Sequence, residues 1–124
     1  MNIYISHSRK FDFKNDLYAP IKASELASKN HFILPHDKTE ELFNTKELFH
    51  SKGCELVIAE VSYPSTGQGI ELGWANAMEI PIVCVYKDKA EFSKSLHEVS
   101  KRFLMYTSKE NMIVDITGTL HNFE

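Results

Sequence analysis

Two short stretches of the sequence are almost continuously hydrophobic, and they constrain the fold more than any other feature. They are LVIAEV at residues 56–61 and IVCVY at residues 82–86. A strand covered by helices on both faces loses the alternation of polar and apolar residues, which is typical of parallel sheets. We therefore expect both runs to be interior strands of a parallel sheet, spanning residues 55–61 and 81–86.

Other runs of apolar and β-branched residues are expected to complete the sheet. They lie at residues 3–6, 31–35 and, with a weaker pattern, 112–116. Helical patterns separate the strands. These helices are expected at residues 16–29, 45–52 (with Asn44 as a possible N-cap), 68–78 and 90–103, the last from the spacing of Phe92, Leu96, Val99 and Phe103.

This order of elements predicts an α/β fold. Strands that alternate with helices form right-handed crossovers onto one parallel sheet. We expect a single domain over residues 1–124, with a three-layer, flavodoxin-like (Rossmann-like) architecture and a five-stranded sheet of order 2-1-3-4-5. In such sheets ligands bind beyond the carboxyl ends of the strands, at the switch point between strands 1 and 3. The loops at residues 6–12 and 62–71 are therefore the first candidates for a site.

Composition excludes several function classes. The chain carries 14 basic and 17 acidic side chains, a formal net charge of −3, so a broad surface for a nucleic-acid polymer is not expected. No apolar run approaches the roughly 18 residues of a membrane span, and the first ten residues lack a signal-peptide core. Cys54 and Cys84 lie in or beside apolar runs without a zinc-binding spacing. We expect a cytoplasmic protein with no metal, no cofactor and no membrane partner.

The most informative stretch is EVSYPSTGQGIELGWAN, at residues 60–76. Gly67 and Gly69 permit close approach of a ligand, and the helix that follows offers N–H groups to an anion. Glu71 is expected in the first turn of that helix. An alternative interpretation is purely structural: Glu71 complements the helix dipole, and Ser65 with Gln68 forms an S-x-x-Q capping box.

The string PSTGQGIELGWA resembles the signature of the nucleoside 2-deoxyribosyltransferase superfamily. It is most similar to the branch of 2'-deoxynucleoside 5'-phosphate N-hydrolases. A tyrosine in the first strand matches Tyr4, and an acidic residue in the helix before the third strand matches Glu47. The resemblance covers roughly the first two-thirds of the chain and fades after Tyr86.

The resemblance implies hydrolysis of the N-glycosidic bond of a deoxyribonucleoside 5'-monophosphate. Glu71 would be the nucleophile that attacks the anomeric carbon and forms a covalent deoxyribosyl-glutamate intermediate, with Tyr4 beside it. Glu47 would assist protonation of the leaving base, although the family position is usually Asp and a Lys-Glu pair on a short helix is commonly a solvated face. Ser65 would donate to a 5'-phosphate, whereas the nucleoside transferases tend to carry Asp there.

The remaining candidate ligands come from two loops on the same edge of the sheet. Ser8 and Arg9 would contact phosphate, although a solvated basic loop is the alternative. His7 and Ser8 occupy the positions where family members often have a Gly-Ser pair. The resemblance therefore does not define the shape of the pocket for the sugar and the base. His36 would reach the base or be a bystander, and Trp74 and Met78 are expected in the core or at a dimer contact.

The resemblance also implies a homodimer whose partner completes the phosphate end of the site. Candidates for that contribution are Ser95, His97 and Ser100 on the expected fourth helix. Three other functions remain open at this point. They are a deoxyribosyltransferase that exchanges bases, a catalytically silent nucleotide-binding or sensing module, and a TIR-like domain that cleaves NAD, suggested by IYISHSRKFD but disfavoured by the glycine-rich block.

Overall fold

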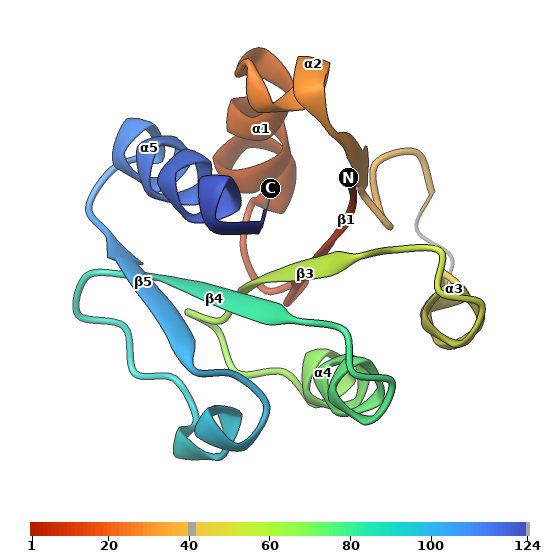
Figure 1. Cartoon of the computed structure of the whole chain (residues 1–124). Helices are drawn as coiled ribbons and strands as arrows, with labels where there is room; N and C mark the ends of the chain where they lie inside the picture. The colour runs from red at the N-terminus through yellow and green to blue at the C-terminus, as the bar shows by residue number, and fades with distance from the viewer. Residues whose placement is uncertain (40–41, 124) are drawn as a thin grey trace.

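The computed structural model describes residues 1–39 and 42–123, and within them five strands form one parallel sheet. The strand order is β2-β1-β3-β4-β5. This is the 2-1-3-4-5 order expected from the sequence, so the predicted α/β architecture is confirmed. Helices cover both faces of the sheet and give the three layers seen in Figure 1.

The strands begin and end within a few residues of the hydrophobic runs that predicted them, except for the last. Their bounds are β1 (Asn2–His7), β2 (His31–Ile33), β3 (Leu56–Glu60), β4 (Ile82–Lys87) and β5 (Arg102–Tyr106). β1 lies between β2 and β3, and its register places Tyr4 beside Val57 and Ser6 beside Ala59 of β3. The carboxyl ends of β1 and β3 therefore meet at the switch point.

The helices divide between the two faces of the sheet. On one face lie the π-helical turn η1 (Lys14–Tyr18), α1 (Ala19–Ala23), α2 (Leu26–Lys29) and α5 (Lys109–Leu120) (Figure 1). On the other lie α3 (Thr45–His50), α4 (Thr66–Ala77) and the 3-10 turn η2 (Lys94–Glu98); a further turn, η3 (His121–Phe123), ends the described chain. None of the helices in the described residues is long and apolar enough to span a membrane.

Each face of the sheet has its own hydrophobic core. Ile3 and Ile5 pack in the cluster that contains residues of η1, α1 and α5. Tyr4 packs in the second cluster, with residues of α3 and α4. Successive side chains of a strand point to opposite faces of the sheet, so alternate residues of β1 pack in each of the two cores. Both cysteines are buried, as expected from the runs in which they lie.

Two local helix predictions have clear outcomes. Asn44 caps α3 as expected, because its side chain accepts a hydrogen bond from the Glu47 N–H at 3.2 Å. The expected continuous helix over residues 16–29 is instead divided into η1, α1 and α2. The break falls at Ser24, whose backbone is extended and whose hydroxyl donates to the Ile21 carbonyl oxygen.

The C-terminal third differs from the sequence prediction. The expected fourth helix over residues 90–103 is wrong, since only η2 is helical there and Phe103 lies in β5. The spacing of Phe92, Leu96, Val99 and Phe103 did identify residues that pack against one core, but through a loop, a turn and a strand. Ser100 ends this segment by donating to the Ile82 carbonyl oxygen and accepting from the Arg102 N–H.

The expected fifth strand at residues 112–116 is also wrong, because these residues belong to α5. Ser108 begins the helix by accepting from the Asn111 N–H. Met112, Ile116 and Leu120 recur at four-residue spacing and are buried. That spacing is the helical one, and it outweighs the β-branched composition that suggested a strand.

Val114 would lie on the same face as Ile116 in a strand but on a different face in a helix. This difference gives a stability prediction. In a strand, residues 112, 114 and 116 would share one face; in α5, Val114 is 67% exposed and Ile116 is 1% exposed. Ile116→Ala should lower the free energy of unfolding by about 2–5 kcal/mol, whereas Val114→Ala should change it by less than about 0.5 kcal/mol. Urea denaturation of both variants measures the difference, and similar losses would contradict the helix.

Candidate active site

A pocket of about 400 Å³ opens at the switch point, and Glu71 lies in its wall. The pocket receives residues from the loops after β1, β2 and β3 and from α3 and α4. Its lining includes both polar and apolar side chains. Most of the residues predicted for the site from sequence line this pocket: His7, Ser8, Arg9, His36, Ser65, Gly67 and Glu71.

Three hydroxyl groups surround the Glu71 carboxylate. Tyr4 Oη donates to Glu71 Oε1 at 2.7 Å, and Thr45 Oγ1 approaches the same oxygen at 3.3 Å. Ser6 Oγ donates to Oε2 at 3.1 Å. Thr45 and Tyr4 are also linked directly, at 2.8 Å between their oxygens. The strand β1 and the start of α3 thus hold this carboxylate in a fixed orientation.

The electrostatics of Glu71 combine two opposed effects. Burial raises the pKa of its carboxyl above the ordinary value of 4.5, because desolvation disfavours the charged form. The hydrogen bonds from Tyr4, Ser6 and Thr45 oppose this shift, since they stabilise the carboxylate. Burial also raises the pKa of the Tyr4 phenol, so Tyr4 keeps its proton and acts as a donor.

Glu71 does not lie where the sequence placed it along the helix. The helix α4 begins at Thr66, so Glu71 is in its second turn, and the expected first-turn position is wrong. The structural alternative fails as well. The Ser65 side chain makes no capping hydrogen bond in the described part of the chain, and Gln68 Nε2 instead donates to the Glu60 carbonyl oxygen at 2.8 Å. Gln68 therefore ties the start of α4 to the end of β3.

The glycines of α4 leave space at the start of the helix. Both Gly67 and Gly69 have negative φ, so neither is required for an unusual backbone shape. Apart from its chain neighbours and the backbone of the same helix, a Cβ added at either position would meet no protein atom within 4 Å. Gly67 lines the Glu71 pocket, and Gly69 lines an adjoining cavity of about 510 Å³. The first turn of α4 thus presents bare backbone to both spaces.

The loop after β1 forms the polar wall. Ser8 is buried and its Oγ accepts from the Lys10 N–H at 3.0 Å, which shapes a tight turn. Lys10 Nζ donates to the Pro64 carbonyl oxygen at 2.8 Å and so joins this loop to the loop after β3. Arg9 Nη2 lies 3.3 Å from His36 Nδ1, which brings the loop after β2 against the same wall.

The apolar wall of the pocket is formed by side chains that sequence analysis did not assign to a site. Leu42 is 93% exposed, Ile70 50% and Phe43 38%, and these are three of the five exposed large hydrophobic residues among those described. Trp74 completes this wall, with Lys46 Nζ 5.9 Å from its ring centroid. An apolar, partly aromatic surface beside a carboxylate suits a flat heterocycle.

Glu47 is not brought to the pocket. It is exposed on α3 and is not among the residues that line the pocket, whereas Thr45, two positions earlier, contacts Glu71. Thr45 and Ser6 are the two hydroxyl donors to Glu71 that sequence reasoning missed. The only available signal was their position, Thr45 at the expected start of a helix and Ser6 at the end of a strand that enters the switch point.

The residues suggested for a partner's contribution are separated by the structure. Ser95 and His97 are exposed on η2, and Ser95 lines the adjoining cavity beside Ser65. Ser100 is buried and bonded within its own chain. Lys10, Ser65 and Gln68 line both cavities and form the ridge between them. Among the residues described, no group of three or more His, Cys, Asp and Glu is arranged to hold a metal ion.

The raised pKa of Glu71 predicts a pH-dependent effect on stability. A folded-state pKa above the unfolded one means that the folded protein loses stability as pH rises from the unfolded through the folded pKa. Glu71→Gln removes this titration, so its free energy of unfolding relative to wild type should increase between pH 4 and pH 7. Denaturant unfolding at both pH values measures it. The exposed Glu91→Gln is the control, and an equal pH response in both variants would contradict the prediction.

Comparison with known proteins establishes the fold independently of the sequence motif. No protein-family model matches the chain, and no curated protein sequence matches it. The structure of the Clostridium botulinum CMP N-glycosidase BcmB is similar to it, with a TM-score of 0.66 and 23% sequence identity. The match covers 94% of this chain and 99% of that chain. The two proteins therefore share one fold over nearly their whole lengths.

Proposed function

We propose that this protein is an enzyme of the nucleoside 2-deoxyribosyltransferase superfamily that hydrolyses the N-glycosidic bond of a nucleoside 5'-monophosphate. The observation that carries the proposal is the Glu71 carboxylate, oriented by three hydroxyl groups in the wall of a switch-point pocket. The shared fold with a CMP N-glycosidase supports the same class of reaction. Residues 64–75 supply the motif that resembles this superfamily.

The proposed reaction has two displacements at the anomeric carbon. A Glu71 oxygen bonds to C1' while the C1'–N bond breaks, and the electron pair leaves with the base, which takes up a proton. Water then attacks C1', one of its protons is lost to solvent, and Glu71 leaves as a carboxylate. Oε2 accepts from Ser6, whereas Oε1 faces both Tyr4 and Thr45. We assign the attack to Oε2, because it has fewer donors to lose among the described residues.

The polar and the apolar residues of the pocket lining suit the phosphate and the base of a nucleotide, respectively. Ser65 and the backbone N–H groups that begin α4 face the same space as Ser8, Arg9 and Lys10. Helix N-termini and basic side chains favour a phosphate. The Ser8 oxygen accepts from Lys10, which leaves its hydrogen for a ligand oxygen. The base would lie against Leu42, Phe43, Ile70 and Trp74.

Hydrolysis is favoured over the other candidate functions. The neighbour with the shared fold is named as a CMP N-glycosidase and not as a transferase. A silent binding module would not need a buried carboxylate whose charge is sustained by hydroxyl donors. For the sugar we propose deoxyribose, because an electron-withdrawing 2'-hydroxyl opposes development of positive charge at C1'. CMP, the ribonucleotide named for the neighbour, is the necessary comparison.

Release of free base is the direct test of this function. Purified protein incubated with CMP, dCMP, the other nucleoside 5'-monophosphates, the matching nucleosides and NAD should release base fastest from a deoxyribonucleotide. Glu71→Gln should lower that rate by roughly a thousandfold or more, because an amide is not a nucleophile. Thermal unfolding of the variant verifies that it is folded. Base release by Glu71→Gln at the wild-type rate would exclude the mechanism.

Ser65→Asp tests which cavity receives the phosphate. A carboxylate at Ser65 should repel a 5'-phosphate and lower kcat/KM for nucleotides by about ten- to a hundredfold. Nucleoside cleavage should fall less, since Asp can accept from a free 5'-hydroxyl. Ser95→Asp is the matched control, because it adds the same charge to the adjoining cavity alone. Equal losses for nucleotides and nucleosides would show that Ser65 supports the turn instead of the phosphate.

A further inference from the structure

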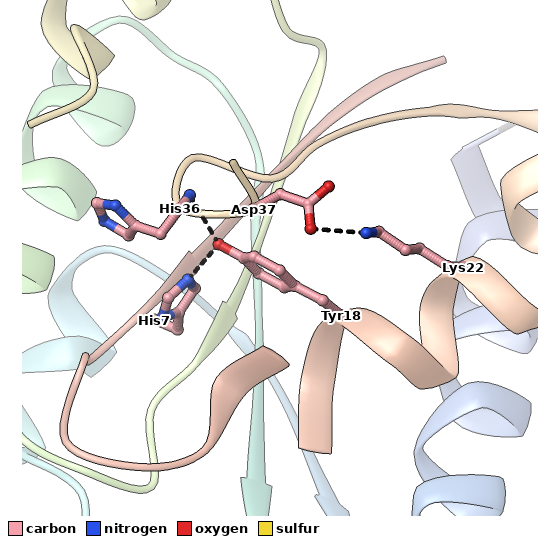
Figure 2. A network of polar contacts seen from close by, with 5 residues as sticks. All are labelled: His7, Tyr18, Lys22, His36 and Asp37. Atoms are coloured by element: carbon pink, nitrogen blue, oxygen red, sulfur yellow. Dashed lines mark hydrogen bonds and ion pairs between the residues drawn. The ribbon is translucent and has the colours of Figure 1, made fainter. Parts of the chain in front are cut away.

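A buried chain of hydrogen bonds connects the end of β1 to the loop after β2, outside the contacts of Glu71 (Figure 2). His7 Nε2 lies 2.6 Å from Tyr18 Oη, and the His36 backbone N–H donates to the same oxygen at 3.1 Å. His7 Nδ1 lies 2.8 Å from the Ser8 carbonyl oxygen. His7 and Tyr18 are 7% and 1% exposed, so water does not substitute readily for these bonds.

The partners fix where the protons are. A carbonyl oxygen only accepts, so His7 Nδ1 carries a proton and donates it to Ser8. Tyr18 Oη already accepts from the His36 N–H, and its own hydrogen points to an acceptor, which is His7 Nε2. The His7 imidazole is therefore neutral, with its proton on Nδ1. A doubly protonated ring would place two donors against Tyr18 Oη and leave the phenol hydrogen without this acceptor.

A second contact reinforces the attachment of the loop after β2. Lys22 lies one helical turn after Tyr18, and its Nζ is 2.6 Å from Asp37 Oδ1 (Figure 2). Two residues four apart on η1 and α1 thus hold two adjacent residues of the loop. His7 is attached to Tyr18 from the other side. The loop after β1 and the loop after β2 are joined through one phenol.

We propose that His7 and Tyr18 are positioning residues for the pocket: the neutral His7 imidazole and the Tyr18 hydroxyl together fix the loop after β2 against the loop after β1. The first loop carries Ser8 and the second carries His36 and Phe43, and all three residues line the pocket that contains Glu71. This inference rests on the proposed function only for its effect on substrate. The attachment itself is a property of the fold.

The surroundings of His7 keep it neutral. Burial lowers the pKa of His7 to about 4, and nearby Arg9 and His36 shift it in the same direction. The rings of Phe13 and His36 lie 4.4 and 5.6 Å from its ring centroid. Burial is the main cause that raises the pKa of Tyr18, and the negative charges of Asp37 and Glu71 raise it further. The phenol therefore keeps its proton.

The protonation pattern is tested by ¹⁵N NMR of the histidine rings, with His7 assigned from its absence in His7→Asn. In the wild-type protein His7 should carry its proton on Nδ1 and stay neutral to about pH 5. In Tyr18→Phe the acceptor Nε2 loses its donor, and the His7 pKa should rise. A proton on Nε2, or wild-type titration near pH 6.5, would overturn the proposal. Both outcomes are independent of catalysis.

Loop positioning is tested with Tyr18→Phe against Tyr106→Phe. The control removes another buried phenol hydroxyl, which bonds Glu60 away from the pocket. Tyr18→Phe should speed hydrogen exchange of the His36 amide by roughly tenfold and raise KM for a cleaved nucleotide about five- to tenfold, with kcat within about twofold. Tyr106→Phe should change neither. An unchanged His36 amide in Tyr18→Phe, or equal effects in both variants, would overturn the proposal, whereas a protein that cleaves no nucleotide would contradict the proposed function alone.

Discussion

Successive side chains of β1 point to opposite faces of the sheet, and this alternation places both hydrophobic cores and both polar networks. Ile3 and Ile5 point into the core beneath η1, α1 and α5, and Tyr4 points into the core beneath α3 and α4. The same alternation sends Ser6 to Glu71 and His7 to Tyr18. A slip of one residue would exchange the faces and remove both networks. The hydrophobic register that buries two isoleucines thereby also determines which polar groups meet the carboxylate.

Two glutamates near the carboxyl ends of the strands, Glu60 and Glu71, differ in their access to ligands. A fully buried carboxylate serves the structure, whereas one that lines a pocket can take part in chemistry. Glu60 is fully buried; its carboxylate accepts from the Ser62 N–H, the Ser62 hydroxyl and the Tyr106 hydroxyl. Those contacts join the ends of β3 and β5. Glu71 also receives hydroxyl donors, yet it lines a pocket, and burial raises its pKa because desolvation disfavours the charged form. A carboxylate in that condition is suited to react with a ligand that replaces water.

The interior strands β3 and β4 could be predicted from the sequence because a strand buried on both faces is an unbroken run of hydrophobic residues. In the C-terminal third, the amino-acid composition and the spacing of hydrophobic residues indicated different secondary structures. Residues 112–116 are β-branched enough to suggest a strand, and only the longer spacing from Met112 to Leu120 reveals a helix. For the site, the glycine-rich block drew attention to Glu71, but Thr45 and Ser6 lie 26 and 65 residues from it. Serine, threonine and tyrosine are too common for such distant contacts to be inferred from sequence. The exposure of Glu47 depends on which face of α3 packs against the protein, and the sequence of this short helix did not determine that face.

The pocket is built from parts of unequal rigidity. Glu71 and its donors Tyr4 and Ser6 belong to α4 and β1, whose backbones are fixed by the sheet and by helical hydrogen bonding. The loop after β2, which supplies His36, Leu42 and Phe43 to the pocket lining, is attached through Tyr18 to His7 and through Asp37 to Lys22. A loop held by a few side-chain bonds can change sequence and shape without moving the sheet. In the proposed reaction this arrangement would let the loop vary while the carboxylate stays in place, so substitutions at His36, Leu42 and Phe43 should alter the choice of substrate before they alter the chemistry.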